Sequence, residues 1–209
     1  MTKERKIVRR KAVGELKREL ILDAARKVFE ADGLDGASLR AIAAGAGYTP
    51  AALYFHFESK EAIYAEVLRG SLTNLGRAVS RAVSRAKAPA DQLRAAATAF
   101  FRYYADNPRD LDLGFYLFRG GMKPQGLGKE RDGMLNAALE SALQPIADAA
   151  QALGARPEEA KSLMADIFAH AAGLLLLADT GRIRMFGASA PHLMERFVEA
   201  KVAALTESR

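Results

Sequence analysis

The chain has 209 residues, of which half are hydrophobic and none is cysteine, and its net charge is +6. This length and composition allow one or two small domains with a real core, and they exclude a disulfide framework and a thiolate metal site. The positive excess is concentrated: residues 1–85 carry 16 Lys or Arg against 10 Asp or Glu, whereas residues 86–209 carry 15 of each. A polyanionic partner is therefore expected for the first part of the chain.

Residues 1–14 form a basic N-terminal arm that contains Lys3, Arg5, Lys6, Arg9, Arg10 and Lys11. Two interpretations stay open for it: a solvated, disordered tail, or an arm that follows phosphates or enters a minor groove once DNA is bound. The first clear helix is predicted over 15–32, where apolar residues follow the 3.6-residue period up to Gly33.

Residues 38–55 predict two short helices joined by a tight turn. Ser38 is placed to cap the first helix, and Thr49 followed by Pro50 is a typical start for the second. Between them, Gly45 and Gly47 supply the backbone freedom that a sharp reversal needs. This pattern predicts a helix-turn-helix, whose second helix enters the DNA major groove.

The run from Gly47 to Ile63, GYTPAALYFHFESKEAI, resembles the DNA-binding signature of the tetracycline-repressor (TetR) family. The resemblance covers about residues 20–68 and implies an all-α protein: a helix-turn-helix domain at 15–58, a connecting helix at 59–85, and a ligand-binding and dimerisation domain at 86–209. It also implies DNA contacts. Phosphate contacts are expected from Tyr54, His56 and Lys60. The remaining candidates lie where base or backbone contacts would fall: Ser38, Arg40, Thr49, Pro50 and Ala51.

The second domain carries aromatic side chains on helical segments that we expect to face each other. One interpretation is a plain aromatic core, and the other is an effector cavity with a few polar groups such as Tyr103. The family resemblance favours the cavity, and the candidate lining residues are Phe100, Phe101, Tyr104, Phe115, Tyr116, Phe118, Phe168 and His170. Glycine-rich residues 119–133 predict a mobile loop after this segment.

The last two predicted helices, 157–179 and 191–205, indicate self-association. From Ala171 onward the first of them is apolar all round, which requires cover on two sides. We expect a four-helix interface across a two-fold axis, formed by Leu174, Leu175, Met194, Phe197, Val198 and Val202. The alternative is that both faces pack within one chain.

No catalytic, dinucleotide or metal-binding motif occurs, so neither an enzyme nor a cofactor is expected. The longest apolar run, residues 171–178, is far shorter than the ~20 residues that span a bilayer, and no signal peptide is recognised. We therefore expect a cytoplasmic homodimeric repressor that binds a palindromic operator in double-stranded DNA and is released by a small, largely apolar effector. Two alternatives remain: a constitutive DNA-binding protein whose second domain only dimerises, and a helical protein-interaction adaptor.

Overall fold

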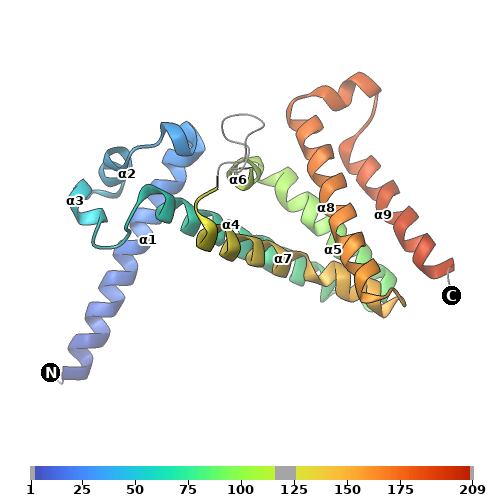
Figure 1. Cartoon of the computed structure of the whole chain (residues 1–209), viewed down its shortest axis with the longest axis horizontal. Coiled ribbons are helices and arrows are strands. Elements are labelled where there is room, and N and C mark those ends of the chain that lie inside the picture. Colours follow the sequence, from blue (N-terminus) through green and yellow to red (C-terminus); the bar gives the residue numbers. More distant parts are fainter. Residues whose placement is uncertain (1–2, 116–125, 208–209) are drawn as a thin grey trace. The chain divides into compact units, whose positions relative to one another are not determined.

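The computed structural model describes residues 3–115 and 126–207 and divides the chain into two compact units (Figure 1). Unit 1 comprises Met1–Gly70 and Asp112–Leu135, and unit 2 comprises Ser71–Leu111 and Asn136–Arg209. The regular structure of the described residues is helical, without a strand, and the all-α prediction is confirmed. The division between the two units falls inside a helix, α4.

Unit 1 is built on α1 (Lys3–Gly36), α2 (Leu39–Ala46), α3 (Pro50–Leu53) and the first part of α4 (Lys60–Val83). Residues 3–14, expected as an arm, are helical and continuous with the helix predicted at 15–32. The physical reason is local: this stretch is rich in Lys and Arg, which favour helix, and it contains no proline. A kink at Gly33, which has φ of 66°, turns the end of α1 toward α2.

The turns of the helix-turn-helix form as the sequence predicts. The backbone N–H of Ala41 donates to Ser38 Oγ at 3.1 Å, and that of Ala52 donates to Thr49 Oγ1 at 3.3 Å. These bonds satisfy one orphan N–H at the start of each helix. Gly47 ends α2 in the left-handed conformation with φ of 73°.

One apolar core holds unit 1 together, and its members come from α1 to α4. Its central aromatic pair is Phe29 and Tyr64, whose rings meet edge to face with centroids 4.9 Å apart. The Tyr64 hydroxyl also donates to the carbonyl of Leu113 at 2.9 Å. Other fully buried members are Ile21, Ala25, Ile42, Ala43, Leu53 and Ile63. This core fixes the short helix α3, which is too short to be stable alone.

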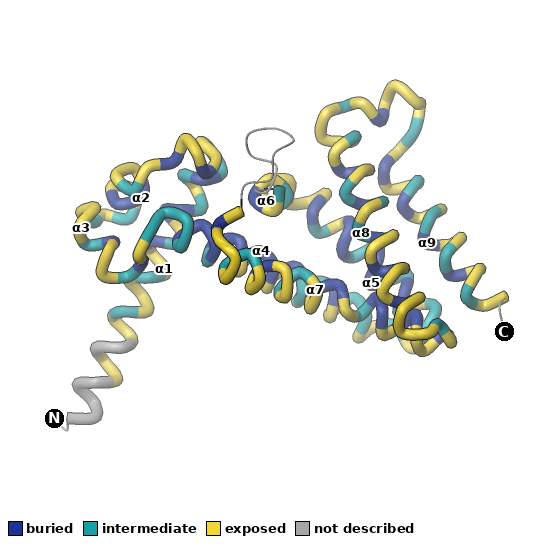
Figure 2. The backbone as a smooth tube through the Cα atoms, viewed as in Figure 1, coloured by how far each residue is buried: buried dark blue, intermediate teal, exposed yellow. Residues whose placement is uncertain are grey.

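Unit 2 contains the rest of α4, α5 (Pro89–Asp106), α8 (Pro157–Asp179), the short helix η2 (Arg182–Phe186) and α9 (Ala190–Glu207). Most of α7 (Lys129–Ala152) also belongs to it, and α6 (Pro108–Gly114) is shared between the units. The loop predicted at 119–133 is shorter than expected because α7 already begins at Lys129; residues 119–125 lie outside the described residues. Buried residues occur along α4, α5, α7, α8 and α9, where the backbone tube in Figure 2 is dark blue.

Candidate functional site

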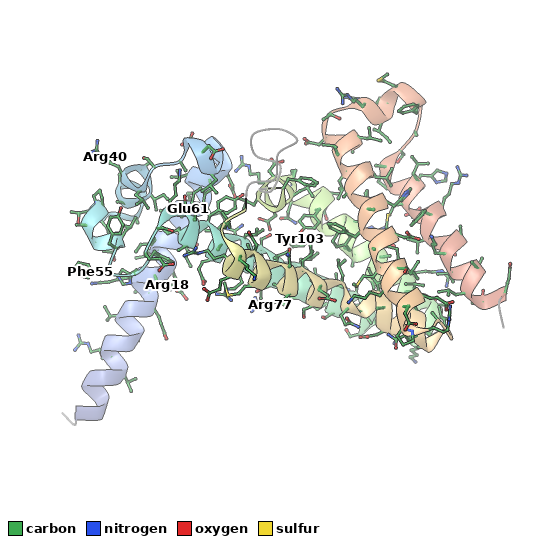
Figure 3. All side chains as sticks on the ribbon, viewed as in Figure 1. Arg18, Arg40, Phe55, Glu61, Arg77 and Tyr103 are labelled. Carbon is green, nitrogen blue, oxygen red and sulfur yellow. The ribbon has the colours of Figure 1, made fainter. Side chains whose placement is uncertain are left out.

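The outer surface of α2, α3 and the turn that follows is the first candidate site, and we call it the α2–α3 face. Its exposed residues are Arg40, Thr49, Pro50, Ala51, Tyr54 and Phe55. Figure 3 shows Arg40 and Phe55 extending outward from this part of unit 1. All the predicted DNA-binding residues except Lys60 therefore lie on or beside the two short helices α2 and α3. Ser38 is exposed, but its hydroxyl already accepts the capping bond, so its role in the structure is to start α2.

Phe55 is the residue of this face that sequence reasoning missed. Its side chain is 88% exposed, the highest value among the large hydrophobic residues that the structure describes as exposed. An isolated, fully solvated phenylalanine brings no stability to the chain. The sequence could have indicated this exposure. Leu53 occupies the buried side of α3, and Phe55, two positions later, cannot lie on the same side of so short a helix.

Arg18, on α1, stabilises the α2–α3 face by bonding to the turn that follows α3. Its guanidinium donates to the backbone carbonyl of His56 at 3.1 Å, lies 3.3 Å from the Glu66 carboxylate on α4, and stands over the Phe57 ring at 4.2 Å. One side chain thus joins α1, the turn after α3, and α4. No sequence pattern indicated this contact, since Arg18 and His56 are 38 positions apart.

The Glu66 carboxylate is held in its charged form by this arrangement. Partial burial acts to raise the pKa of Glu66, but the hydrogen bond and charge of Arg69, together with the charge of Arg18, outweigh burial and lower it. Arg69 donates to Glu66 at 2.7 Å. The result is a network of one carboxylate and two guanidiniums behind the α2–α3 face.

Lys60, predicted to contact phosphate, is half-buried, and its Nζ donates to the carbonyl of Ala37 at 2.9 Å. The bond ties the first residue of α4 to the connection between α1 and α2. A lysine has three ammonium donors, so this bond leaves two for a phosphate.

The second candidate site is a groove in unit 2, with a volume of about 1010 Å³. Its walls come from α4, the end of α5 and α7, and the polar residues among them are Thr73, Asn74, Arg77, Ser80, Arg81, Tyr103, Asn107 and Ser141. The apolar part consists of Leu72 and small residues at 76, 78, 138 and 142. Tyr103 is placed by α5 and α6: its hydroxyl lies 3.2 Å from the Ser71 carbonyl and 2.5 Å from the Asp110 carboxylate.

The predicted aromatic lining lies elsewhere. In unit 2, the rings of Phe100 and Tyr104 meet edge to face at 5.4 Å, and Phe168 lies 5.9 Å from Phe100. Burial is the main reason that the pKa of Tyr104 is raised. Phe100, Phe101 and Tyr104 are buried in the core, and Phe115 belongs to unit 1. None of these side chains lines the groove, and Tyr116 and Phe118 lie outside the described residues.

The candidate interface residues of α8 and α9 are covered within their own chain. Leu174, Leu175, Met194, Val198 and Val202 are all at most 5% exposed. Phe197 is half-buried, and its ring stacks on that of His170 with a centroid distance of 3.9 Å. The two helices lie side by side in Figure 1. The exposed small or apolar residues of α8 are a different set, and they include Ala165, Ala169, Gly173 and Leu176; Ala200 on α9 is also exposed.

The N-terminal part of the chain is similar to known proteins. Residues 21–67 match the model of the family described as bacterial regulatory proteins, tetR family. A transcriptional regulator of the helix-turn-helix type from Mycobacterium tuberculosis is 32% identical over 94 residues, which are 45% of this chain and 46% of that protein. The transcriptional repressor KstR2 of Rhodococcus jostii is 42% identical over 59 residues, 28% of this chain and 29% of the repressor. The match thus spans less than half the length of either curated relative.

The whole fold is also shared. FadR of Bacillus subtilis, solved in complex with stearoyl-CoA, superimposes with a TM-score of 0.68 over 88% of this chain and 97% of its own, at 15% identity. At that identity the likeness concerns the fold alone. Together, the matched segment at residues 21–67 and the helix-turn-helix regulators similar to it support a transcriptional regulator of the TetR family, and the solved structure of FadR shares the two-part helical fold.

Proposed function

We propose that this protein is a homodimeric repressor that binds a palindromic operator and is released from it by a small-molecule effector. The observation that carries the DNA-binding part is the α2–α3 face, a supported but exposed surface that contains Arg40, Tyr54 and a solvated Phe55. The repressor KstR2, similar in this segment, supports the direction of regulation.

On DNA, α3 would lie in the major groove. Tyr54, His56 and Lys60 would hold phosphates and fix the position of the helix without reading sequence. Ala51 and Phe55 offer no hydrogen bond, so their contribution to specificity would be apolar contact with thymine methyl groups.

Selection from a library of random DNA duplexes, followed by fluorescence anisotropy on the selected site, tests this function. We expect a palindrome whose half-sites are one helical turn apart or a multiple of it. Arg40→Ala and Phe55→Ala should weaken binding to the selected site, and the control Lys87→Ala, an exposed residue between α4 and α5, should not. Failure to enrich any sequence would contradict the proposal.

For the homodimer, we propose an interface on the free sides of α8 and α9. The exposed residues of α8 at 165, 169, 173 and 176 are small or apolar and recur at the 3.6-residue period, and α9 adds the exposed Ala200. By length and composition alone, α8 is apolar enough to cross a membrane, although only 33% of its most apolar window is buried. A second copy covering this side accounts for that composition and for the two-fold symmetry of a palindromic operator.

The proposed effector site is the groove of unit 2. One structural relative, FadR, was solved with stearoyl-CoA, and this supports a ligand-binding role for the second part of the fold. The wall formed by α4 belongs to the same continuous helix that begins at Lys60 in unit 1. A ligand that displaces this wall would act on the helix that carries Lys60 and would change the spacing of the two recognition helices.

Reciprocal linkage tests this coupling. A ligand that weakens operator binding must itself bind more weakly to the operator complex, by the same factor. Calorimetric titration of the free protein and of the operator complex measures both affinities. Equal affinities would mean that the groove and the DNA site are uncoupled.

A further inference from the structure

We infer that the groove of unit 2 binds an amphiphilic ligand through an anionic head, a carboxylate or a phosphate, held between Arg77 and Arg81. The inference deepens the effector site proposed above. It rests on the proposed function only in taking the groove as a ligand site. Arg77 and Arg81 could bind an anion whether or not the ligand controls DNA binding.

The charges that line the groove are all of one sign. Among the described residues, Arg77 and Arg81 are its charged lining residues; the Asp110 carboxylate is not part of the lining and accepts a hydrogen bond from the Tyr103 hydroxyl at 2.5 Å. Other arginines of unit 2 are neutralised: Arg94 binds the Glu199 carboxylate at 2.8 Å, and Arg156 binds that of Glu159 at 2.6 Å. The described lining of the groove therefore carries two positive charges that are not neutralised in this way.

The bonds that Arg77 and Arg81 do make are weak and leave most donors available. Arg77 donates to the Asn74 amide oxygen at 3.4 Å, and Arg81 Nε donates to the carbonyl of Arg77 at 3.2 Å. Each guanidinium carries five N–H donors in a planar fork, which suits bidentate binding of carboxylate or phosphate. The two residues are four apart on one helix, a spacing at which like charges repel, and an anion placed between them would remove the repulsion.

The rest of the groove fits an apolar chain attached to such a head. Leu72 is buried at the wall, and the small residues Gly76, Ala138 and Ala142 leave room beside it. At the base of the groove α4 approaches α7, since a methyl group built on Gly76 would lie 3.7 Å from Ala142. The volume of about 1010 Å³ lies at the upper end of the range of small-molecule sites.

Calorimetry with four probes of equal chain length tests the inference on the full-length protein: decanoate, decyl phosphate, decanol and decyltrimethylammonium, each below its micelle concentration. We expect decanoate or decyl phosphate to bind at least tenfold more tightly than decanol, and the cationic probe to bind most weakly. The ratio between the two anions identifies which head the groove prefers.

The double variant Arg77→Gln/Arg81→Gln should lose the preference for anions, while the control Arg85→Gln, just beyond α4 and outside the groove lining, should keep it. Both altered side chains are exposed, so the fold should be retained, and circular dichroism checks this. Equal binding of decanol and the anions, a preference that survives the double variant, or no saturable binding of either anion would overturn the inference.

Two further measurements separate this inference from the proposed function. If the anions bind as expected but leave operator affinity unchanged, the head-group site stands and the ligand-responsive function fails. The double variant could instead lower the slope of log K against log salt for DNA binding by an amount equivalent to about two phosphate contacts, and leave decanoate binding intact. In that case the arginines contact DNA and the inference is overturned.

Discussion

Lys60 has two possible roles, and a single substitution separates them. Lys60→Ala removes the bond to the Ala37 carbonyl and should lower the free energy of unfolding by about 1 kcal/mol. If the remaining donors also hold a phosphate, the slope of log K against log salt should fall by about one. Denaturant titration and anisotropy at several salt concentrations measure the two effects, with Lys87→Ala as the control. A stability loss with an unchanged slope would make Lys60 purely structural.

Glu66 should contribute to the pH dependence of stability. Its folded pKa lies below its ordinary value of 4.5, so its contribution is present above that value and is lost as pH falls through the folded pKa. Glu66→Gln should therefore destabilise the protein at pH 7 and have much less effect near pH 3. Urea midpoints across this range measure the difference, and Glu19→Gln, an exposed glutamate of α1, is the control. An equal cost at both ends of the range would contradict the network with Arg18 and Arg69.

At the scale of elements, the turn between α2 and α3 depends on the backbone of Gly47. A side chain there would meet nothing within 4 Å, so only the positive φ of 73° opposes substitution. Gly47→Ala should cost about 1–2 kcal/mol of stability and weaken operator binding, because α3 would be displaced. Gly14→Ala is a matched control inside α1, also without a neighbour within 4 Å, and should be neutral or stabilising by about 0.5–1 kcal/mol. A neutral Gly47→Ala would show that the turn adapts.

At the scale of the whole molecule, two adjacent leucines of α8 distinguish the core from the proposed interface. Leu176 is 54% exposed, whereas Leu175 is 4% exposed. Leu176→Asp should give folded monomers, since it places a charge on the side that a second copy would cover. Leu175→Asp should unfold unit 2, because it buries an unpaired charge in the core of a single chain.

Sedimentation velocity and circular dichroism measure these two outcomes. A folded dimer for Leu176→Asp would contradict an interface on this side of α8. The control variant is Lys201→Ala, which removes a surface ion pair between α9 and Asp166 on α8. This variant should leave both the fold and the dimer intact.

The sequence alone determined the features that depend on neighbouring residues. Ser38, Thr49 and Pro50 define helix starts, because a cap bonds to an N–H only three residues away. The 3.6-residue period likewise located α4, α5, α8 and α9, although it did not reveal that α1 extends back to Lys3 or that α7 begins at Lys129. The resemblance around Tyr54 supplied the family, which the comparisons confirm.

Only the tertiary structure decided which distant residues meet. Arg18 reaches His56 and Glu66, and no local pattern encodes a contact across 38 residues. An apolar stripe shows that one side of a helix is covered, but it does not show which neighbour covers it. Leu175 and Met194 were expected between two copies, but both are buried within one chain. The groove could not be predicted for the same reason, because a cavity is the space that packed helices leave unfilled. Phe100, Phe101 and Tyr104, which were expected to line a cavity, are buried in the core instead.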